Sequence, residues 1–406
     1  MVKVVVLMVS VVLAGARAQY CTDELLLDGS EPVERAAIDT TGVWWAITVP
    51  FAGQQRLIVG GMRTASYDQI LPPVISPDGR HWTAWAKRSG AWYLLVDTMM
   101  VPIVCTAPGV LAFAPVAPIL VLSCYDAGAE LIAIGSAQYS AIRRVGPLAI
   151  SPDGTQVAWV EQVERIHRLV VNGKELATAE EIRLAGFWHD GHPLYAARSG
   201  GQWRIRRGTE DLGGPYFALG SLLVNRFGTC AVAHVIQEPW HSVLLISDDY
   251  SQPLASQLYE NIWSLVLHPY LPQYGALAMR QNTYYVLHTG TEYGIGRFPL
   301  EAISFTADGS ELYGIGCDVD CFLVLNGQRF PLGQDLSTKL VIARRPSSQT
   351  FAYSTPTNLF VRRVDKATFT YSRMCDAVLP AFYNRQRNRY EALGIVQGRL
   401  YLLTCP

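Results

Sequence analysis

The chain has 406 residues, of which 50% are hydrophobic and 17% are charged, and its formal net charge at pH 7 is −1. This composition excludes an intrinsically disordered chain, because disorder requires few apolar residues and a high net charge. Tyr, Trp and Val are abundant, which favours β-strands, and the sequence lacks the motifs of zinc proteases, P-loop nucleotide-binding proteins and α/β-hydrolases.

Residues 1–18 have the three parts of a secretory signal peptide: a positive charge at Lys3, an apolar core over residues 4–13, and the small-residue segment Ala16-Arg17-Ala18. As a helix, the apolar core would rise about 15 Å, half of the roughly 30 Å hydrocarbon layer, so a membrane anchor is disfavoured. We expect cleavage after Ala18 and a secreted or periplasmic mature chain over residues 19–406. That chain has no apolar run long enough to span a bilayer.

A five-residue pattern, an apolar residue followed by Ser-Pro-Asp-Gly, occurs in full at Ile75–Gly79 and Ile150–Gly154. Degenerate copies continue at intervals of 37 to 43 residues along the chain. The ten copies start at Ile38, Ile75, Phe113, Ile150, Phe187, Val224, Leu267, Phe305, Ala343 and Phe382. Nine such regular intervals indicate an internal structural repeat.

Each repeat has the same internal order of four short apolar segments, which we name strands A, B, C and D. Proline, aspartate and glycine suit the tight turn between A and B, because proline fixes φ, aspartate bonds its own backbone and glycine adopts positive φ. Four antiparallel strands in about 38 residues form one propeller blade. We therefore predict an all-β propeller of about ten blades, with repeats that start near residues 36, 73, 110, 147, 184, 221, 264, 302, 340 and 378.

The repeats resemble those of the bacterial TolB-like and WD-like propeller families, whose hallmark is the same Ser-Pro-Asp-Gly turn followed by a strand of small and aromatic residues. The resemblance covers nearly the whole mature chain, but it implies a fold only, since these repeats occur in proteins of many functions. The sialidase Asp box is similar at Ser76 to Trp82 but is excluded, because here glycine directly follows aspartate.

The last repeat supplies strands A, B and C and ends without strand D, whereas Asp23 to Leu27 belongs to no other repeat. We expect the N-terminal segment to complete the last blade and close the ring, which removes exposed strand edges. One ten-bladed ring is favoured. Two tandem five-bladed rings with a boundary near Gly220 are the alternative, because most propellers have four to eight blades.

Eight cysteines in an exported chain allow disulfides to form. The predicted closure brings Cys21 next to Cys405. Similar reasoning on strand ends pairs Cys105 with Cys124 and Cys317 with Cys321, whereas Cys230 and Cys375 fall on opposite faces and are expected to be unpaired. Lipid attachment at Cys21 is disfavoured, because Ala18-Gln19-Tyr20 lacks the small and aliphatic residues of a lipoprotein signal.

Positive charge is concentrated at the C-terminal end of the chain. Residues 339–406 hold eleven Lys or Arg and three acidic residues, a balance of +8. The A-to-B and C-to-D turns of a blade share one face of the ring, and the last two repeats place eight cations on that face. We predict that this face binds phosphate, sulfate or carboxylate groups, with a merely solvated rim as the alternative. The eight are Arg344, Arg345, Arg362, Arg363, Lys366, Arg385, Arg387 and Arg389.

Other polar residues give weaker signals. His189, Asp190 and His192 could contact a metal, but Asp190 already has a role in the turn and the set lacks a fourth ligand. Asp318 and Asp320 are too few for calcium. His234 and His241 are interpreted as ordinary residues at strand ends. No metal or cofactor is expected.

The preferred function is a monomeric binding or scaffolding protein of the cell envelope, which holds a protein or polyanionic partner on the basic face. Export disfavours nucleic acid as that anion. A hydrolase or lyase with its site in the central tunnel is the alternative, since such a site would draw residues from several blades. The predicted A strands, such as Pro73 to Ile75, are apolar, which favours binding over catalysis.

Overall fold

The structure is a computed structural model, and it describes most of the chain from Cys21 onward. The described residues are 21–27, 35–38, 45–59, 62–97, 99–103, 105–250, 252–296, 300–306, 311–317, 321–325, 328–333, 342–344, 350–355, 357–363, 369–384, 387–397 and 399–405. The signal peptide predicted over residues 1–18 lies outside these ranges.

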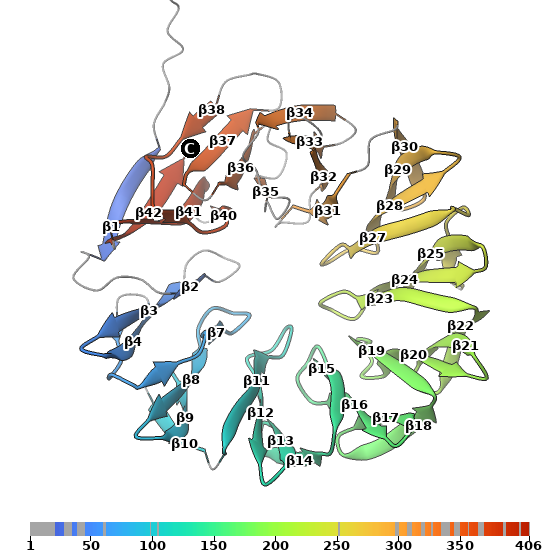
Figure 1. Cartoon of the computed structure of the whole chain (residues 1–406), viewed down its shortest axis with the longest axis horizontal. Helices are drawn as coiled ribbons and strands as arrows, with labels where there is room; N and C mark the ends of the chain where they lie inside the picture. Colours follow the sequence, from blue (N-terminus) through green and yellow to red (C-terminus); the bar gives the residue numbers. More distant parts are fainter. Residues whose placement is uncertain are drawn as a thin grey trace, which may run out of the picture.

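Ten antiparallel sheets follow one another around a ring, and each contributes one blade of a β-propeller (Figure 1). We number the blades by the order of their innermost strands in the chain. The first five are β2 (Arg35–Ile38), β3 (Trp45–Phe51), β4 (Gln54–Val59) and β5 (Met62–Arg63); β6 (Gln69–Ile70) and β7 (Val74–Ile75) with β8 (Trp82–Arg88), β9 (Ala91–Val96) and β10 (Met99–Pro102); β11 (Ala107–Phe113), β12 (Leu120–Asp126), β13 (Ala129–Ile134) and β14 (Ala137–Ala141); β15 (Arg144–Ile150), β16 (Val157–Val163), β17 (Ile166–Val171) and β18 (Lys174–Ala179); and β19 (Glu181–Phe187), β20 (Pro193–Ser199), β21 (Gln202–Arg207) and β22 (Glu210–Tyr216).

The second half of the ring repeats this arrangement. Its blades are β23 (Ala218–Val224), β24 (Cys230–Gln237), β25 (Trp240–Ser247) and β26 (Leu254–Ala255); β27 (Asn261–Leu267), β28 (Tyr274–Arg280), β29 (Thr283–His288) and β30 (Thr291–Gly296); β31 (Ala302–Phe305), β32 (Leu312–Cys317), β33 (Cys321–Leu325) and β34 (Gln328–Gly333); β35 (Ile342–Arg344), β36 (Thr350–Ser354), β37 (Leu359–Arg363) and β38 (Phe369–Tyr371); and β39 (Ala377–Val378) and β40 (Phe382–Asn384) with β41 (Arg389–Val396), β42 (Arg399–Cys405) and β1 (Thr22–Leu27).

The Ser-Pro-Asp-Gly segment forms the turn between strands A and B through its own side chains. In blade 2 the Ser76 hydroxyl donates to Asp78 Oδ1 at 2.5 Å, and Asp78 Oδ1 also accepts from the backbone of Arg80. Gly79 has a φ of 69°, which an L side chain rarely adopts, and its amide donates to the Ser76 carbonyl. The repeated motif is therefore a self-contained turn, which explains its recurrence in blade after blade.

Among the described residues, the hydrophobic core is divided into ten clusters, one at each junction between neighbouring blades. At the junction of blades 4 and 5, for example, Val160 and Leu169 pack against Tyr195 and Phe187. Side chains on the two sides of each strand alternate between the two adjacent junctions, as the period of two requires. Each blade is thus held by both of its neighbours.

The ring is closed by both ends of the chain, as predicted. Strand β1 pairs antiparallel with β42, with Thr22 opposite Thr404, and so completes blade 10. Cys21 is disulfide-bonded to Cys405, and a second disulfide joins Cys105 to Cys124.

The alternative of two five-bladed rings is wrong. Blades 5 and 6 share one apolar cluster, in which Trp203 and Leu194 pack with Ala233 and Leu244. Blades 10 and 1 share another, which includes Leu402 and Ile47. Two separate rings would instead require blade 5 to pack on blade 1 and blade 10 on blade 6. The chain is a single ten-bladed propeller (Figure 1).

No helix that could cross a membrane occurs in the part of the chain that the structure describes.

Candidate binding site at the A-to-B turns

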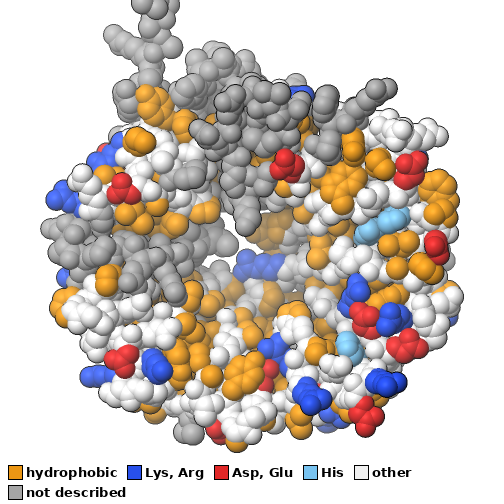
Figure 2. All heavy atoms as spheres, viewed as in Figure 1, with side chains coloured by type: hydrophobic (Ala, Val, Ile, Leu, Met, Phe, Trp, Pro, Cys, Tyr) orange, Lys and Arg blue, Asp and Glu red, His pale blue; other side chains and the backbone are white. Residues whose placement is uncertain are grey.

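The two faces of the ring carry different turns. The A-to-B and C-to-D turns lie on one face, which we call the A-to-B face, and the B-to-C turns and the connections between blades lie on the other. Figure 2 views the ring along its axis and shows it hollowed at the centre, with a basic side chain at the opening.

The structure describes the predicted basic residues of blades 9 and 10 only in part. Arg344 ends β35, and Arg362 and Arg363 end β37, so the backbone of all three lies where strands meet the A-to-B face. Their side chains lie outside the described atoms, as do Arg345, Lys366 and Arg385 altogether. Their role in anion binding stays a prediction.

Arg387 and Arg389 have a function within the protein. Both contact the carboxylate of Glu391, Arg389 through Nε at 2.7 Å and Arg387 through a terminal nitrogen at 3.5 Å. Glu391 is completely buried, and its other oxygen accepts a hydrogen bond from Asn384 at 2.8 Å. A buried carboxylate must be paired, so these two guanidinium groups compensate it and offer less free charge to a ligand than the sequence indicated.

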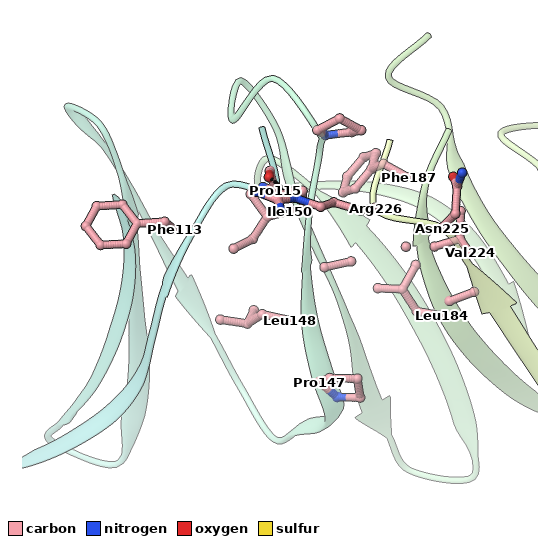
Figure 3. A pocket seen from close by; sticks show the side chains of 14 residues that line it. Phe113, Pro115, Pro147, Leu148, Ile150, Leu184, Phe187, Val224, Asn225 and Arg226 are labelled. Carbon is pink, nitrogen blue, oxygen red and sulfur yellow. Dashed lines mark hydrogen bonds between the residues drawn. The ribbon is translucent and has the colours of Figure 1, made fainter. Parts of the chain in front are cut away.

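A pocket of about 340 Å³ opens on the inner wall of the ring, across the innermost strands of blades 3 to 6 (Figure 3). Its walls are mainly apolar, and Arg226 is the only ionisable side chain among the residues that line it. They are Phe113, Pro115, Pro147, Leu148, Ala149, Ile150, Pro152, Leu184, Ala185, Gly186, Phe187, Val224, Asn225 and Arg226.

Arg226 lies in the A-to-B turn of blade 6 and reaches back towards blade 3. Its Nε donates a hydrogen bond to the Pro115 carbonyl at 2.5 Å, and Figure 3 shows the side chain beside Pro115 and Ile150. Among the described residues, no carboxylate forms an ion pair with Arg226. The turn that carries it is fixed by Asn225, whose Oδ1 accepts from the Thr229 amide at 2.9 Å. Arg226 leaves no signal in the sequence, because its partner lies three blades away.

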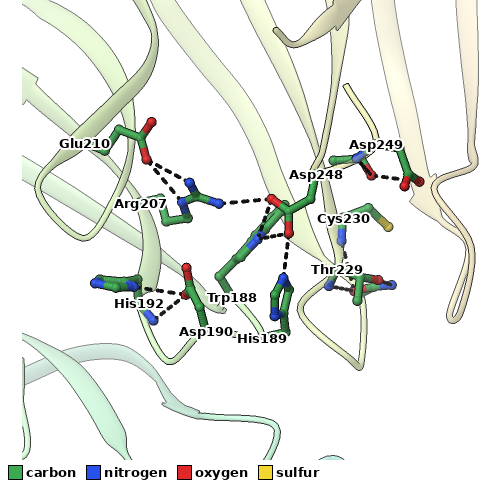
Figure 4. A network of polar contacts seen from close by, with 12 residues as sticks. Trp188, His189, Asp190, His192, Arg207, Glu210, Thr229, Cys230, Asp248 and Asp249 are labelled. Carbon is green, nitrogen blue, oxygen red and sulfur yellow. Dashed lines mark hydrogen bonds and ion pairs between the residues drawn. The ribbon is translucent and has the colours of Figure 1, made fainter. Parts of the chain in front are cut away.

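A second polar cluster joins blades 5 and 6 on the same face (Figure 4). Asp248 accepts hydrogen bonds from Trp188 Nε1 at 2.9 Å, from His189 Nε2 at 2.5 Å and from Arg207 at 3.0 Å. Burial opposes ionisation of Asp248, but the bonds from His189 and Trp188 outweigh it and hold the pKa of this carboxyl below its usual value. The cluster fastens the buried indole of Trp188 to the neighbouring blade.

The histidines of this turn contact different carboxylates. His189 binds Asp248, whereas His192 Nδ1 lies 3.1 Å from Asp190. Within the described residues there is no group of three or more potential ligands that could hold a metal ion. The turn thus uses these side chains to position its own backbone and the adjacent blade. Asp318 and Asp320, the two carboxylates too few to bind calcium, lie outside the described residues.

The interpretation of His234 as an ordinary strand-end residue was wrong, whereas His241 does lie at a strand end, as the second residue of β25. His234 lies inside β24 and is 9% exposed, and its Nε2 is 2.9 Å from Nδ1 of His241 on β25. Burial lowers the pKa of His234 to about 4, with a further contribution from His241, and burial also lowers the pKa of His241. Gly220 makes room for the ring, since a Cβ there would lie 2.1 Å from His234 Nδ1.

The remaining cysteines divide into two groups. Cys230 and Cys375 are buried and free, and burial raises the pKa of both thiols, that of Cys230 to about 12, which disfavours the thiolate form. Cys317 and Cys321 stand opposite each other in the β32–β33 ladder. Their side chains lie outside the described atoms, so the predicted bond between them stays a prediction.

Comparison with known proteins adds no functional assignment. No protein-family model matches the sequence, and no curated protein matches it. Similar solved structures include the dihydro-heme d1 dehydrogenase NirN in complex with DHE, with a TM-score of 0.39, 14% identity and coverage of 75% of this chain and 67% of that one. The Dos1 propeller has a TM-score of 0.39 at 9% identity, over 95% of this chain and 94% of its own.

The C-terminal WD40 domain of Sif2 is also similar, with a TM-score of 0.35 at 13% identity, over 74% of this chain and 96% of that domain. Similarities at this level do not carry a function to this chain. The ten antiparallel sheets, eight of four strands and two in which strand A is divided into two short strands, establish a WD40-like β-propeller at the level of the fold. The closer resemblance to TolB-like repeats stays a prediction.

Proposed function

We propose that this chain is an exported binding protein of the cell envelope, which holds an anionic protein or polyanion on its A-to-B face. The propeller fold supports a binding or scaffolding role, because a closed ring of sheets presents many turns on one broad face. The positive charge of residues 339–406 is the observation that favours an anionic partner. This segment holds eleven Lys or Arg and only three acidic residues.

The arrangement of the described strands supports this choice of surface. Strands β35 and β37 end in Arg344 and Arg363, and both ends lie on the A-to-B face. Arginine binds carboxylate, phosphate and sulfate groups through two parallel hydrogen bonds, so several arginines on one rim suit an extended anion.

The proposed export rests on residues 1–18 and is supported by the disulfides. Two disulfides in one chain are typical of an oxidising compartment, where the glutathione pool does not reduce them. N-terminal sequencing of the protein from its native source tests this part directly. We expect Gln19 as the first residue, and a chain that begins at Met1 would contradict export by cleavage.

The basic face is tested by affinity capture of the tagged mature chain from the native envelope. The variant to compare is Arg344→Ser, Arg345→Ser, Arg362→Ser and Arg363→Ser together. Arg387 and Arg389 are left unchanged because they compensate the buried Glu391. A matched control changes three exposed arginines on the opposite face, Arg88, Arg143 and Arg165, to serine.

We expect a stoichiometric partner that the wild type and the control retain and that the quadruple variant loses. Retention should also weaken as salt is raised, because exposed charges are screened. A partner held equally by all three proteins would show that the basic face is only a solvated rim. The tunnel alternative, a hydrolase or lyase, is less well supported, since Arg226 is the only ionisable residue of the pocket in the inner wall.

A further inference from the structure

The pocket in the inner wall has features of a small-molecule site that is separate from the basic rim. It spans four consecutive blades, from Phe113 on β11 to Val224 on β23, so it exists only in the assembled ring. Its volume of about 340 Å³ is at the lower end of the range of ligand pockets, about 300 to 1,000 Å³. The occupant is therefore a small molecule and not a protein segment of any length.

Irregular inner strands shape the walls of this pocket. Strand β15 loses its register with β16 between Val145 and Ala149, which leaves Pro147 and Leu148 outside the regular ladder. Strand β19 is irregular in the same way between Leu184 and Gly186. Bulges of this kind bend a strand and re-aim its side chains, and they are frequent beside functional sites.

The wall between blades 5 and 6 depends on one close approach. A Cβ at Gly186 would lie 2.4 Å from Cγ1 of Val224, so only glycine lets the two inner strands pack side by side here. Proline at positions 115, 147 and 152 stiffens the other walls. The pocket is thus built from rigid backbone, which reduces the cost of ordering it around a ligand.

The charge in the pocket comes from a single cation, Arg226, which lines it beside the polar Asn225. Arg226 is held across the rim by the bond from its Nε to the Pro115 carbonyl, at 2.5 Å, which orients the guanidinium without neutralising it. Its terminal nitrogens form no ion pair with any carboxylate in the described part of the chain. A guanidinium placed in this way is suited to bind one carboxylate, by donating hydrogen bonds from its terminal nitrogens.

We propose that this pocket binds a small amphipathic acid, with an apolar body against Leu148, Leu184 and Val224 and its carboxylate on Arg226. One cation and apolar walls match one anionic group and one apolar body. A polyanion would leave further charges unpaired against these walls, and a neutral hydrocarbon would not use Arg226. This site does not depend on the basic rim of blades 9 and 10, so either proposal can fail without the other.

The test uses three probes with the same ten-carbon chain and different head groups: decanoate, decanol and decyltrimethylammonium, each below the concentration at which it forms micelles. Binding to the full mature protein is measured by titration calorimetry. We expect one site for decanoate and at least tenfold weaker binding of the other two, because only the carboxylate forms charge-assisted hydrogen bonds with arginine.

Arg226→Gln should weaken decanoate binding about tenfold or more and leave decanol binding unchanged, and Arg226→Lys should give an intermediate loss. Arg80→Gln is the matched control, since Arg80 is exposed in the same turn of blade 2, away from the pocket. Thermal unfolding of each variant identifies a loss caused by misfolding. Decanoate binding that is absent in the wild type, or unchanged in a folded Arg226→Gln variant, would overturn the proposal.

Discussion

Cys21 and Cys405 are 384 residues apart in the sequence, and their Cα atoms lie 4.6 Å apart in the disulfide that closes the ring. A bond over so long a loop removes much conformational freedom from the unfolded chain. It also fixes β1 beside β42, so that blade 10 keeps its fourth strand. Strands β1 and β42, which lie near the two ends of the chain, are therefore held together in one blade.

Replacing both Cys21 and Cys405 by serine should lower the free energy of unfolding by about 3 to 5 kcal/mol. Urea denaturation followed by tryptophan fluorescence measures the loss. The control replaces Cys105 and Cys124, which are separated by 19 residues, and should cost less in the same chain-entropy account. If the control loses as much free energy of unfolding or more, the Cys21–Cys405 disulfide does not stabilise the protein through the length of the loop that it closes.

A second prediction concerns the carboxylate that fastens blade 5 to blade 6. Asp248→Ala removes the acceptor of the Trp188 indole N–H, and Trp188 is only 1% exposed. An unsatisfied buried donor costs about 1 to 3 kcal/mol, and the exposed bonds of Asp248 to His189 and Arg207 add little. We expect a loss in this range by chemical denaturation, and a near-zero loss for Asp249→Ala in the same turn.

The same carboxylate predicts acid sensitivity. Its pKa is lowered in the folded protein, so its contribution to stability is present above the unfolded value near 3.9 and is lost as the pH falls through the folded pKa. Asp248→Asn should therefore flatten the stability profile below about pH 4. A profile of unchanged slope would contradict the assignment of these bonds.

The pair His234 and His241 should also make the protein less stable as the pH falls. This loss should occur at higher pH values than the loss caused by Asp248. The pKa of His234 is about 4 in the folded protein against roughly 6.5 in the unfolded chain, so the unfolded state binds the proton more strongly. The free energy of unfolding should fall as the pH decreases from about 6.5 to 4, by about 2 to 3 kcal/mol, and change little from this group below pH 4. Urea midpoints across this range measure it.

His234→Phe keeps a ring in the space beside Gly220 but cannot titrate, so the decline between pH 6.5 and 4 should become shallower. His192→Asn is the control, because His192 is largely exposed on the other face. If the variant and the wild type decline in parallel, the proton uptake belongs to other groups.

The fold could be predicted from the sequence because its defining feature is local. The Ser76 and Asp78 side chains bond within their own turn, so the motif is complete in blades 2 and 4 and leaves regularly spaced, degenerate copies in the other repeats. Counting repeats then gave the number of blades. The segment Asp23 to Leu27 belongs to no other repeat, and only the last repeat lacks a fourth strand. The pairing of these two parts predicts a single closed ring.

The site could be predicted much less well, because its contacts join residues far apart. Arg226 and Pro115 are 111 residues apart, and no local pattern relates them. The pairing of Arg389 with Glu391 did leave a signal, because residues two apart on a strand point to the same side. His234 and His241 left one too, since the hairpin register sets Ile236 opposite His241 and puts both rings on one side.

The A-to-B turns of blades 5 and 6 are in close contact at Gly228. Gly228 has a φ of 68°, and a Cβ there would lie 2.5 Å from the Phe187 carbonyl oxygen and 2.6 Å from the His189 nitrogen. Both neighbours are backbone atoms of blade 5, and the His189 amide donates to the Gly228 carbonyl at 2.9 Å. Gly228→Ala must therefore shift one turn against the other.

The matched control is Gly90→Ala, since Gly90 has a similar φ of 82° and no heavy atom within 4 Å of a built Cβ. Gly90→Ala should lower the free energy of unfolding only by the strain of positive φ, about 1 kcal/mol. Gly228→Ala should lower it by about 2 to 4 kcal/mol, as measured by urea denaturation. The difference between them isolates the contact between blades. If both variants lose the same free energy of unfolding, the turns of blades 5 and 6 can move apart to admit the new methyl group. The close contact between these turns would then not contribute to stability.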